Sequence, residues 1–456
     1  MDVKGKKVTV VGLGETALAA VRLLLREGAR PFVTDSSDGP KQRKLRETLE
    51  AWDVPCELGG HTDAAFDGVA LVIPSPGVSP DVEAVQRAHA SGADVVGEME
   101  FAFPYCRSRL LAVTGTNGKT TVTELLTALI GACGRRVQLA GNNACPFSAA
   151  VMLEPPPEFI VLEVSSYQLE TTRSFRPWVA AVLNVTPDHL ARHRSLEAYA
   201  AVKARIFANQ RAGDVAVVNY DDPLVRPMAD GSQAVVWPFS QQTRLDSGLW
   251  CDGETIRLGD EAVAHVADTQ LRGRHNIENV LCALSAMRAG GFDWAATLEG
   301  LRAFRGVEHR IEYVAEIDGA AFYNDSKSTN VESLRVALGS FDAPVVLIAG
   351  GRGKGSDYAV LEALVRERVR KMVVLGEDAP KLEQAFAAVV DVERVEDMAS
   401  AVTRAAAAAR PGDVVLLSPA CASFDMYENF EHRGRVFKEC VRVNAVHHKE
   451  KGEPAS

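Results

Sequence analysis

The stretch Leu110–Thr121, LLAVTGTNGKTT, decides the fold of this chain. An apolar run, Leu110–Val113, leads into the glycine-containing segment Thr114–Thr121, and a helical pattern over Val122–Ile130 follows directly. A buried strand that turns through glycines into a helix presents backbone N–H groups and the positive end of the helix dipole to an anion. The pattern therefore predicts a phosphate-binding loop between a buried strand and a helix.

The side chains of this loop suit a polyphosphate. Lys119 supplies a mobile cation for the terminal phosphates, and Thr120 or Thr121 supplies a hydroxyl for Mg²⁺. The loop departs from the usual G-x-x-x-x-G-K-[ST] pattern, because Val113 stands where its first glycine is expected. The residues predicted to bind the phosphates are Gly115, Thr116, Asn117, Gly118, Lys119, Thr120 and Thr121.

Length, charge and cysteine content narrow the class of protein. At 456 residues the chain should form two or three domains. A net charge of −10 argues against binding to nucleic acid or anionic membranes, and no apolar run is long enough to span a membrane. Eight scattered cysteines without a C-x-x-C pair suggest neither a disulfide framework nor a zinc site. The chain starts without a signal-peptide pattern, so we expect a cytoplasmic protein.

Strand and helix patterns alternate along three segments, which predicts an α/β fold with parallel sheets. The first segment opens with the strand Lys7–Val11, and the second begins near Gly97 and carries the phosphate loop. The third begins near Val307 and repeats the alternation. We therefore predict domains at residues 1–97, 98–306 and 307–456.

The first strand is followed by a turn that resembles a dinucleotide-binding fingerprint. Gly12 and Gly14 give a G-x-G, Ala17 is the third small residue, and Asp35 stands at the spacing expected for the ribose-binding acid. The turn predicts nucleotide or phosphate binding. A nicotinamide-dependent oxidoreductase and a merely structural turn are the alternatives.

Polar residues at the ends of the next strands predict a metal site. Glu163 ends the strand pattern Phe159–Ser166, and Asp188 and His189 follow the next strand. Ligands of open α/β sheets gather at these strand ends, where a carboxylate beside a phosphate loop can hold Mg²⁺. By its pattern alone, Lys203 is a surface lysine whose stem lies along an amphipathic helix.

The last part of the chain adds four more polar clusters, most of them after a strand. Their density suits the binding of an anionic ligand better than turn formation alone. The clusters are Arg272–Asn276 with Asn279, Asn324–Asn330, Gly350–Gly355 and Ser418–Asp425.

Taken in this order, these strings resemble the Mur ligases of peptidoglycan synthesis over nearly the whole chain. The resemblance rests on GTNGKTT, LEVSSYQLE, NVTPDH, GRHNIEN, EHR, NDSKSTN, GGRGKG and SPACASFD. NDSKSTN and SPACASFDMYENF favour the family member that adds D-glutamate over its siblings. The resemblance implies a Rossmann-like UDP-binding domain, a central P-loop ATPase-like domain and a Rossmann-like C-terminal domain that binds the amino acid.

The resemblance also implies a reaction and its cofactors. ATP would phosphorylate the carboxylate of UDP-N-acetylmuramoyl-L-alanine, and the amine of D-glutamate would attack the acyl phosphate. Thr120 and Glu163 would hold one Mg²⁺, and His189 would help hold a second. Lys203 matches a lysine that this family carbamylates, which would turn a cation into a metal-facing carboxylate. Asn142 would lie near the transferred phosphate.

The same correspondence assigns residues to each ligand. The nucleotide would be surrounded by Asn276, Asn279, His309, Arg310 and Asp325. The UDP group would meet Gly14, Thr16, Asp35, Ser36, Ser75, Pro76, Gly77 and Val78. D-Glutamate would meet Lys327, Thr329, Lys354, Ser423 and Phe430, with Lys354 pairing its side-chain carboxylate. We expect a monomer that binds no nucleic acid and does not insert into a membrane.

Several positions depart from the family's pattern. They are Glu15, Ala17, Asn143 with Ala144, Ala191 and Arg352. The alternatives of the same mechanistic class are a sibling ligase that adds another amino acid and a folylpolyglutamate synthase. A nicotinamide oxidoreductase and a non-catalytic nucleotide-binding protein are alternatives of other classes.

Overall fold

The computed structural model describes residues 2–271, 273–353 and 355–452. The chain forms three sheets and two compact units. The first unit consists of the chain up to Thr269 together with the later segment Glu278–Ala303. The second unit consists of the short segment Gln270–Ile277 and the chain from Phe304 onward. The predicted three-domain α/β fold is confirmed, whereas the boundaries after residues 97 and 306 remain a prediction.

The first sheet is parallel throughout and has the strand order β3-β2-β1-β4-β5. Its strands are β1 (Lys7–Val11), β2 (Arg30–Asp35), β3 (Cys56–Leu58), β4 (Leu71–Pro74) and β5 (Asp94–Val95). The helices of this segment are α1 (Glu15–Arg26), α2 (Pro40–Ala51) and α3 (Glu83–Ala90). The strand order reverses between β1 and β4, and open α/β sheets bind ligands at such a point.

The second sheet has the order β14-β13-β12-β11-β10-β9-β6-β8-β7. Its strands are β6 (Arg109–Thr114), β7 (Val137–Gly141), β8 (Phe159–Glu163), β9 (Val179–Val182), β10 (Val215–Asn219), β11 (Val235–Ser240), β12 (Leu249–Cys251), β13 (Thr255–Leu258) and β14 (Glu261–His265). Its helices are α4 (Glu98–Ala102), α5 (Lys119–Ala132), α6 (Phe147–Ala150), α7 (Ser166–Leu169), α8 (Leu190–His193), α9 (Leu196–Ala204), α10 (Arg274–Ala289) and α11 (Trp294–Ala303). Because β6 lies between β8 and β9, the segments that follow these three strands meet at one edge.

The prediction of parallel sheets holds for most of the second sheet but not for its end. The three short strands β12, β13 and β14 pair antiparallel, because the turns between them are too short for a crossover connection. This part of the sheet lies away from β6 and its phosphate loop.

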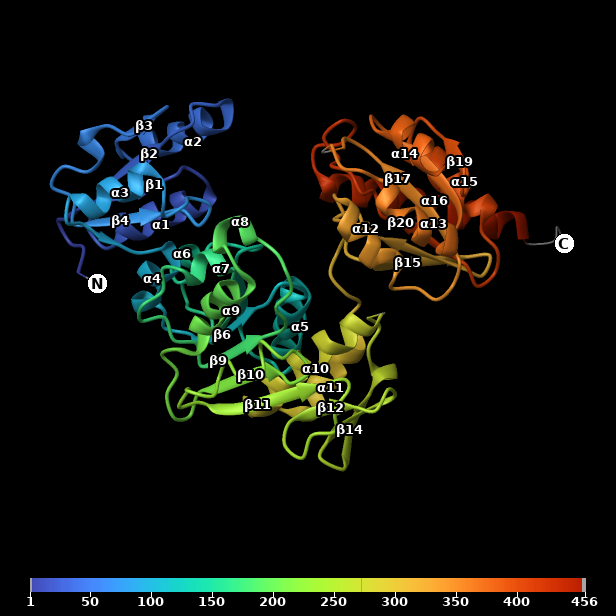
Figure 1. The fold of residues 1–456 in the computed structure, drawn as a ribbon, viewed down its shortest axis with the longest axis horizontal. Coiled ribbons are helices and arrows are strands. Elements are labelled where there is room, and N and C mark those ends of the chain that lie inside the picture. Colours follow the sequence, from blue (N-terminus) through green and yellow to red (C-terminus); the bar gives the residue numbers. More distant parts are fainter. Residues whose placement is uncertain (1, 272, 354, 453–456) are drawn as a thin grey trace. The chain divides into compact units, whose positions relative to one another are not determined.

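The third sheet has the order β15-β16-β20-β17-β18-β19, with only the β15–β16 pair antiparallel. Its strands are β15 (Glu312–Ile317), β16 (Ala320–Asn324), β17 (Val345–Gly350), β18 (Val369–Leu375), β19 (Asp391–Arg394) and β20 (Val414–Leu417). Its helices are α12 (Val331–Leu338), α13 (Glu362–Arg368), α14 (Ala379–Phe386), α15 (Met398–Ala408) and α16 (Phe430–Gly452), drawn in orange to red in Figure 1.

Two apolar clusters cover the two faces of the third sheet. Along β17, Leu347 packs with α12, α13 and α14, whereas Val346 and Ile348 pack with α15 and α16. Alternate residues of a strand point to opposite faces, so a strand covered on both faces reads as a continuous apolar run. The third sheet is therefore a doubly covered α/β sheet whose strand ends are left free for a site.

Candidate active site

The phosphate loop connects β6 to α5, as the sequence predicts. Gly118 caps α5 with a φ of +84°, a conformation that favours glycine. A Cβ on Gly118 would lie 2.2 Å from Oδ1 of Asn279, so Asn279 lies directly against the loop. The Lys119 ammonium donates to the carbonyls of Gly115 and Thr116 at 3.0 and 2.8 Å.

The neighbouring strand helps to hold this loop through Asn184, which follows β9. The carbonyl of Asn184 accepts from Thr116 N, and its side-chain Oδ1 accepts from Asn117 N, both at 2.9 Å. Sequence analysis did not single out Asn184 as a functional residue, although it is the first letter of the NVTPDH string. The loop is thus fixed by an adjacent strand end as well as by its own glycines.

Glu163 lies at the end of β8 beside the phosphate loop and is almost fully buried. Its Oε1 accepts from Nδ2 of Asn142 at 3.1 Å and from Nδ2 of Asn143 at 2.9 Å. Asn143 Nδ2 also donates to Oγ1 of Thr120 at 3.0 Å. The two oxygens predicted to bind Mg²⁺ therefore converge on one amide nitrogen, and this oxygen pair suits a small, hard cation.

Lys203 is only 1% exposed, in contrast to the surface lysine that its helical pattern indicates. The helix α9 packs its C-terminal end toward the phosphate loop, and the Lys203 ammonium donates to Gly115 O at 2.8 Å. It also lies 4.3 Å from the centre of the Tyr199 ring. Burial lowers the pKa of Lys203 to about 7, and the charge of Lys119 acts in the same direction.

His189 stands on the same side of the sheet, after β9. It caps α8 in a left-handed conformation, with a φ of +53°. Its Nε2 lies 3.5 Å from Asp188 Oδ2, and its ring centre lies 5.0 Å from that of Tyr167. The imidazole is exposed and remains available to a ligand.

A cavity of about 450 Å³ joins the first sheet to the second within the same unit. It is lined by residues after β1, β4 and β7, at the point where the order of the first sheet reverses. The predicted residues in this lining are Gly14, Thr16, Ser75, Pro76, Gly77 and Asn142. The predicted UDP contacts and the residue expected near the transferred phosphate therefore share one cavity.

The remaining predicted UDP contacts lie close to this cavity without lining it. Asp35 accepts from Leu13 N at 2.6 Å and from Ser37 N at 2.7 Å, so it shapes the turns after β1 and β2. Ser36 follows it on the surface. Val78 lines a neighbouring cavity of about 320 Å³, on the other side of the segment after β4.

The second unit gathers further predicted residues at the carboxyl ends of its strands. Asp325 follows β16 and is buried, where it accepts from Ile311 N at 3.2 Å and from Ser418 Oγ at 2.8 Å. Burial raises the pKa of Asp325 to about 6. Arg310 is exposed and contributes to the charge around Asp325.

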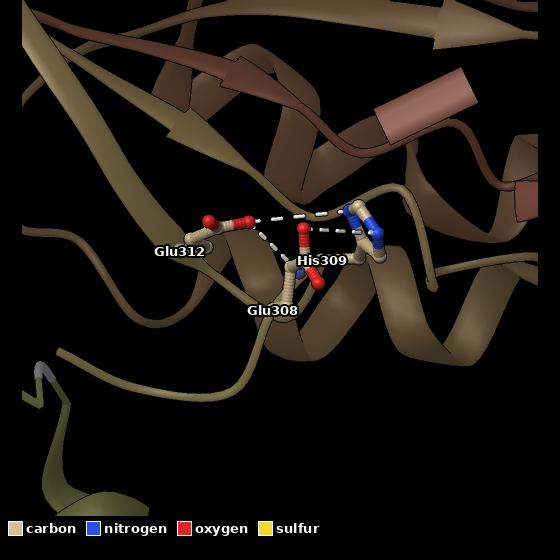
Figure 2. Close-up of side chains that lie close together, drawn as sticks. All are labelled: Glu308, His309 and Glu312. Carbon is tan, nitrogen blue, oxygen red and sulfur yellow. Dashed lines mark hydrogen bonds and ion pairs between the residues drawn. The ribbon is translucent and has the colours of Figure 1, made fainter. Parts of the chain in front are cut away.

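His309 belongs to a cluster with Glu308 and Glu312 that has the composition of a metal site (Figure 2). Asn324 Nδ2 donates to His309 Nδ1 and to Glu312 Oε2, both at 2.9 Å. Lys438 from α16 donates to Glu308 at 2.6 Å and to Glu312 at 2.8 Å. Because the Lys438 ammonium already donates to both carboxylates and offsets part of their charge, we interpret the cluster as an anchor for His309.

The predicted D-glutamate residues lie in the segments after β16 and β20 and at the start of α16. The Lys327 ammonium lies 5.7 Å from the centre of the Phe430 ring, and the His309 ring lies 6.1 Å from it. Thr329 follows in the same segment as Lys327, and Ser423 is buried after β20.

Three further residues singled out in the sequence lie apart from the predicted D-glutamate contacts or outside the described residues. Lys354 lies outside the described residues. Arg352, which departs from the family's pattern, pairs with Glu377 at 2.8 Å on the surface. Asn276 is buried near the start of α10, in the second unit.

Sequence comparisons match all three segments. The Mur ligase MurD-like N-terminal domain matches residues 6–97, the Mur ligase middle domain residues 113–287, and the Mur ligase glutamate ligase domain residues 309–421. A relative from Pelotomaculum thermopropionicum is 43% identical over 446 residues, covering 96% of this chain and 98% of the relative. The chain belongs to the Mur ligase family.

Other Mur ligases agree with this assignment. The relative from Pelotomaculum and one from Caldanaerobacter subterraneus are both named UDP-N-acetylmuramoylalanine–D-glutamate ligase. The Caldanaerobacter protein is 40% identical, covering 97% of this chain and 99% of the relative. The crystal structure of a UDP-N-acetylmuramate-alanine ligase from Thermotoga maritima shares the fold at a TM-score of 0.59 and 18% identity, covering 96% of this chain and all of that one.

Within this Mur ligase, sequence analysis also missed Asn143 and Arg433. Asn143 was noted only as a departure from the family's pattern, and its contact to both predicted metal ligands could have been suspected only from its neighbour Asn142. Arg433 gives no motif signal, because its partners lie in three distant segments.

Proposed function

We propose that this chain is the ATP-dependent ligase that joins D-glutamate to UDP-N-acetylmuramoyl-L-alanine. The observation that carries the proposal is the convergence of Thr120 and Glu163 on one atom beside the phosphate loop. The names of its relatives support the choice of substrates. The cavity that joins the first two sheets supports a nucleotide-linked substrate whose carboxylate end reaches Asn142.

The first step would be phosphoryl transfer from ATP to the substrate carboxylate. The loop N–H groups and the Lys119 ammonium would hold the triphosphate, while Thr120 and Glu163 would hold Mg²⁺. A bound Mg²⁺ neutralises charge on the phosphates and the carboxylate. Phosphoryl transfer needs positioning and charge neutralisation more than covalent help, and these residues are arranged to provide both.

The second step would be attack by the amine of D-glutamate on the acyl phosphate. The amine nitrogen would form a C–N bond to give a tetrahedral intermediate, which loses one amine proton and collapses as the C–O bond to phosphate breaks, so the products are an amide and inorganic phosphate. His189 and a second Mg²⁺ would stabilise the developing negative charge. Lys327, Thr329, Ser423, Phe430 and Lys354 are the proposed contacts of D-glutamate.

Lys203 is proposed to act as a carbamate. Carbamylation needs a neutral amine, which gains a bond to the carbon of CO₂ and releases a proton. Burial favours the neutral form of Lys203, because it lowers the amine pKa to about 7. The resulting carboxylate would lie beside Gly115, where it could support the second Mg²⁺.

We further propose a cytoplasmic monomer, supported by the use of ATP and by a set of site residues that one chain supplies. Among the described helices, none combines the length and the apolar character that crossing a membrane requires.

An amino-acid panel tests the proposed function. The full-length protein is incubated with ATP, Mg²⁺, UDP-N-acetylmuramoyl-L-alanine and one amino acid at a time, and phosphate release is measured. We expect release with D-glutamate and little with L-glutamate or L-alanine. Equal turnover of L- and D-glutamate, or a preference for a diamino acid, would contradict the proposal.

A further inference from the structure

Arg433 is a buried cation that the proposed mechanism does not use. It lies on α16, close to its start, and its side chain is among the most buried of the charged groups, at 2% exposure. A guanidinium offers five N–H donors in a rigid plane, so it can bind several acceptors at fixed angles. Burial of such a charge is costly unless its donors are satisfied.

The donors of Arg433 are satisfied by three different segments. Nε donates to Ser326 Oγ at 3.0 Å, and one terminal nitrogen donates to Ser326 O at 2.9 Å and to Cys421 O at 3.1 Å. The other terminal nitrogen donates to Ala422 O at 3.3 Å and to Gly350 O at 3.4 Å. A single side chain thus joins the segments that follow β16, β17 and β20.

The strand order explains why one guanidinium can reach all three segments. In the third sheet β20 lies between β16 and β17, so the carboxyl ends of these strands are neighbours. Gly351 allows the close approach, because a Cβ there would lie 2.3 Å from Ala422 O and 3.1 Å from the guanidinium. Its φ of +127° also disfavours any other residue.

The surroundings of Arg433 are unusual for a buried arginine. Its hydrogen-bond partners among the described residues are carbonyls and one hydroxyl, and the carboxylates of Asp425 and Asp325 act on it through Coulomb attraction alone. An arginine that served only to bury charge would more often pair with an acid. Here the guanidinium binds the backbone beneath the strand ends where an acidic amino acid is proposed to bind, and no hydrogen bond to a carboxylate of the described residues takes up its donors.

We propose that Arg433 is a positioning residue for the amino-acid substrate. Its guanidinium fixes the segments that carry Lys327, Thr329 and Ser423, so that these side chains meet D-glutamate in one geometry. The inference rests on the proposed function, because it concerns the same amino-acid site. A misplacement of about 1 Å in such segments can cost about a hundredfold in rate.

The test compares Arg433→Lys with Arg370→Lys in the full-length enzyme. Arg370 is a control in the same sheet, because two of its guanidinium nitrogens donate, at 2.8 and 3.1 Å, to Asp413 before the start of β20, away from the strand ends that Arg433 joins. Lysine keeps the positive charge and loses the planar fork. Steady-state kinetics would be measured with each substrate varied in turn, after wild-type turnover of D-glutamate has been established.

We expect Arg433→Lys to raise the KM for D-glutamate about tenfold or more, with the KM for UDP-N-acetylmuramoyl-L-alanine changed less than about twofold. The kcat should fall by less than the KM rises. Arg370→Lys should leave all these values near wild type. Equal rises in the two KM values, or an unchanged KM for D-glutamate in a folded Arg433→Lys, would overturn the proposal.

Hydrogen exchange without substrates gives a second readout that does not depend on the reaction. In Arg433→Lys the amides of residues 326–330, 350–353 and 420–425 should exchange faster, while those of the strands behind them stay protected. Unchanged exchange in these segments would overturn the proposal. If wild type fails to use D-glutamate but the segments loosen, the proposed substrate is wrong and the positioning role of Arg433 stands.

Discussion

The phosphate loop and the strand ends of the C-terminal sheet are held in different ways. The loop is shaped by its own glycines, and it is supported from outside by Asn184, which follows the adjacent strand, and by the Lys203 ammonium. The C-terminal segments have direct hydrogen bonds to one another, and the side chain that joins all three of them is an arginine 107 positions away from Ser326. A site built from local backbone geometry can be recognised in the sequence, whereas a site that depends on a distant side chain cannot.

The largest effect is expected in the first region, from Lys119→Ala. Loss of a positioned cation at a transferring phosphoryl group typically costs about 10²–10³ in kcat. The loss should appear with every amino acid tested and at saturating D-glutamate, in contrast to Arg433→Lys. Phosphate release at saturating substrates measures it, and a variant that keeps more than about a tenth of wild-type kcat would contradict the role of Lys119.

Lys203→Ala should have the next largest effect, a loss of about a hundredfold, because a carboxylate beside the metal would be missing. Added acetate or formate should restore part of the activity by supplying that carboxylate. The same salts added to wild type serve as the control. Activity that is lost but not restored by any short carboxylic acid would argue against a carbamate, and so would full activity in the variant.

Asp325→Asn tests the electrostatics of the second region through stability. An unfolded aspartate has a pKa of about 3.9, and burial raises the pKa of folded Asp325 to about 6. Between these values the native state binds more protons than the unfolded state. The contribution of Asp325 to the free energy of unfolding is therefore fully present below about pH 4 and is lost as the pH rises through about 6.

We expect the free energy of unfolding of wild type, minus that of Asp325→Asn, to fall as the pH rises from 4 to 8. Urea unfolding of both proteins at several pH values measures this difference. A difference that stays constant with pH would show that folding does not raise the pKa of Asp325, and would contradict this prediction.

The smallest effect is expected from Asn143→Ile, which removes the side-chain amide and keeps a side chain of similar reach. The Asn143 amide donates to Glu163 and Thr120, so it competes with a cation for both oxygens. Its removal should tighten Mn²⁺ binding, followed by electron paramagnetic resonance with a non-hydrolysable ATP analogue, by about threefold. Weaker binding would instead assign Asn143 as a ligand of the metal.

Much of the first region could be predicted from the sequence, because strand, glycine turn and helix follow one another in the chain. Glu163 could also be predicted, since parallel strands bring their carboxyl ends to one edge, whereas Asn142 came only from the resemblance to the family. The burial of Lys203 could not be predicted from the sequence, because it depends on how the end of α9 packs toward the phosphate loop. Arg433 and the Lys438 anchor of His309 depend on where α16 lies, which no local pattern encodes.

The most direct test of the central claim follows the oxygen atoms of the substrate. UDP-N-acetylmuramoyl-L-alanine labelled with ¹⁸O in its carboxylate is turned over with ATP, Mg²⁺ and D-glutamate, and the released phosphate is analysed by mass spectrometry. If Lys119 and Glu163 serve transfer of a phosphoryl group onto that carboxylate, one ¹⁸O appears in each phosphate. Phosphate without ¹⁸O, formed together with the amide product, would contradict the acyl-phosphate route.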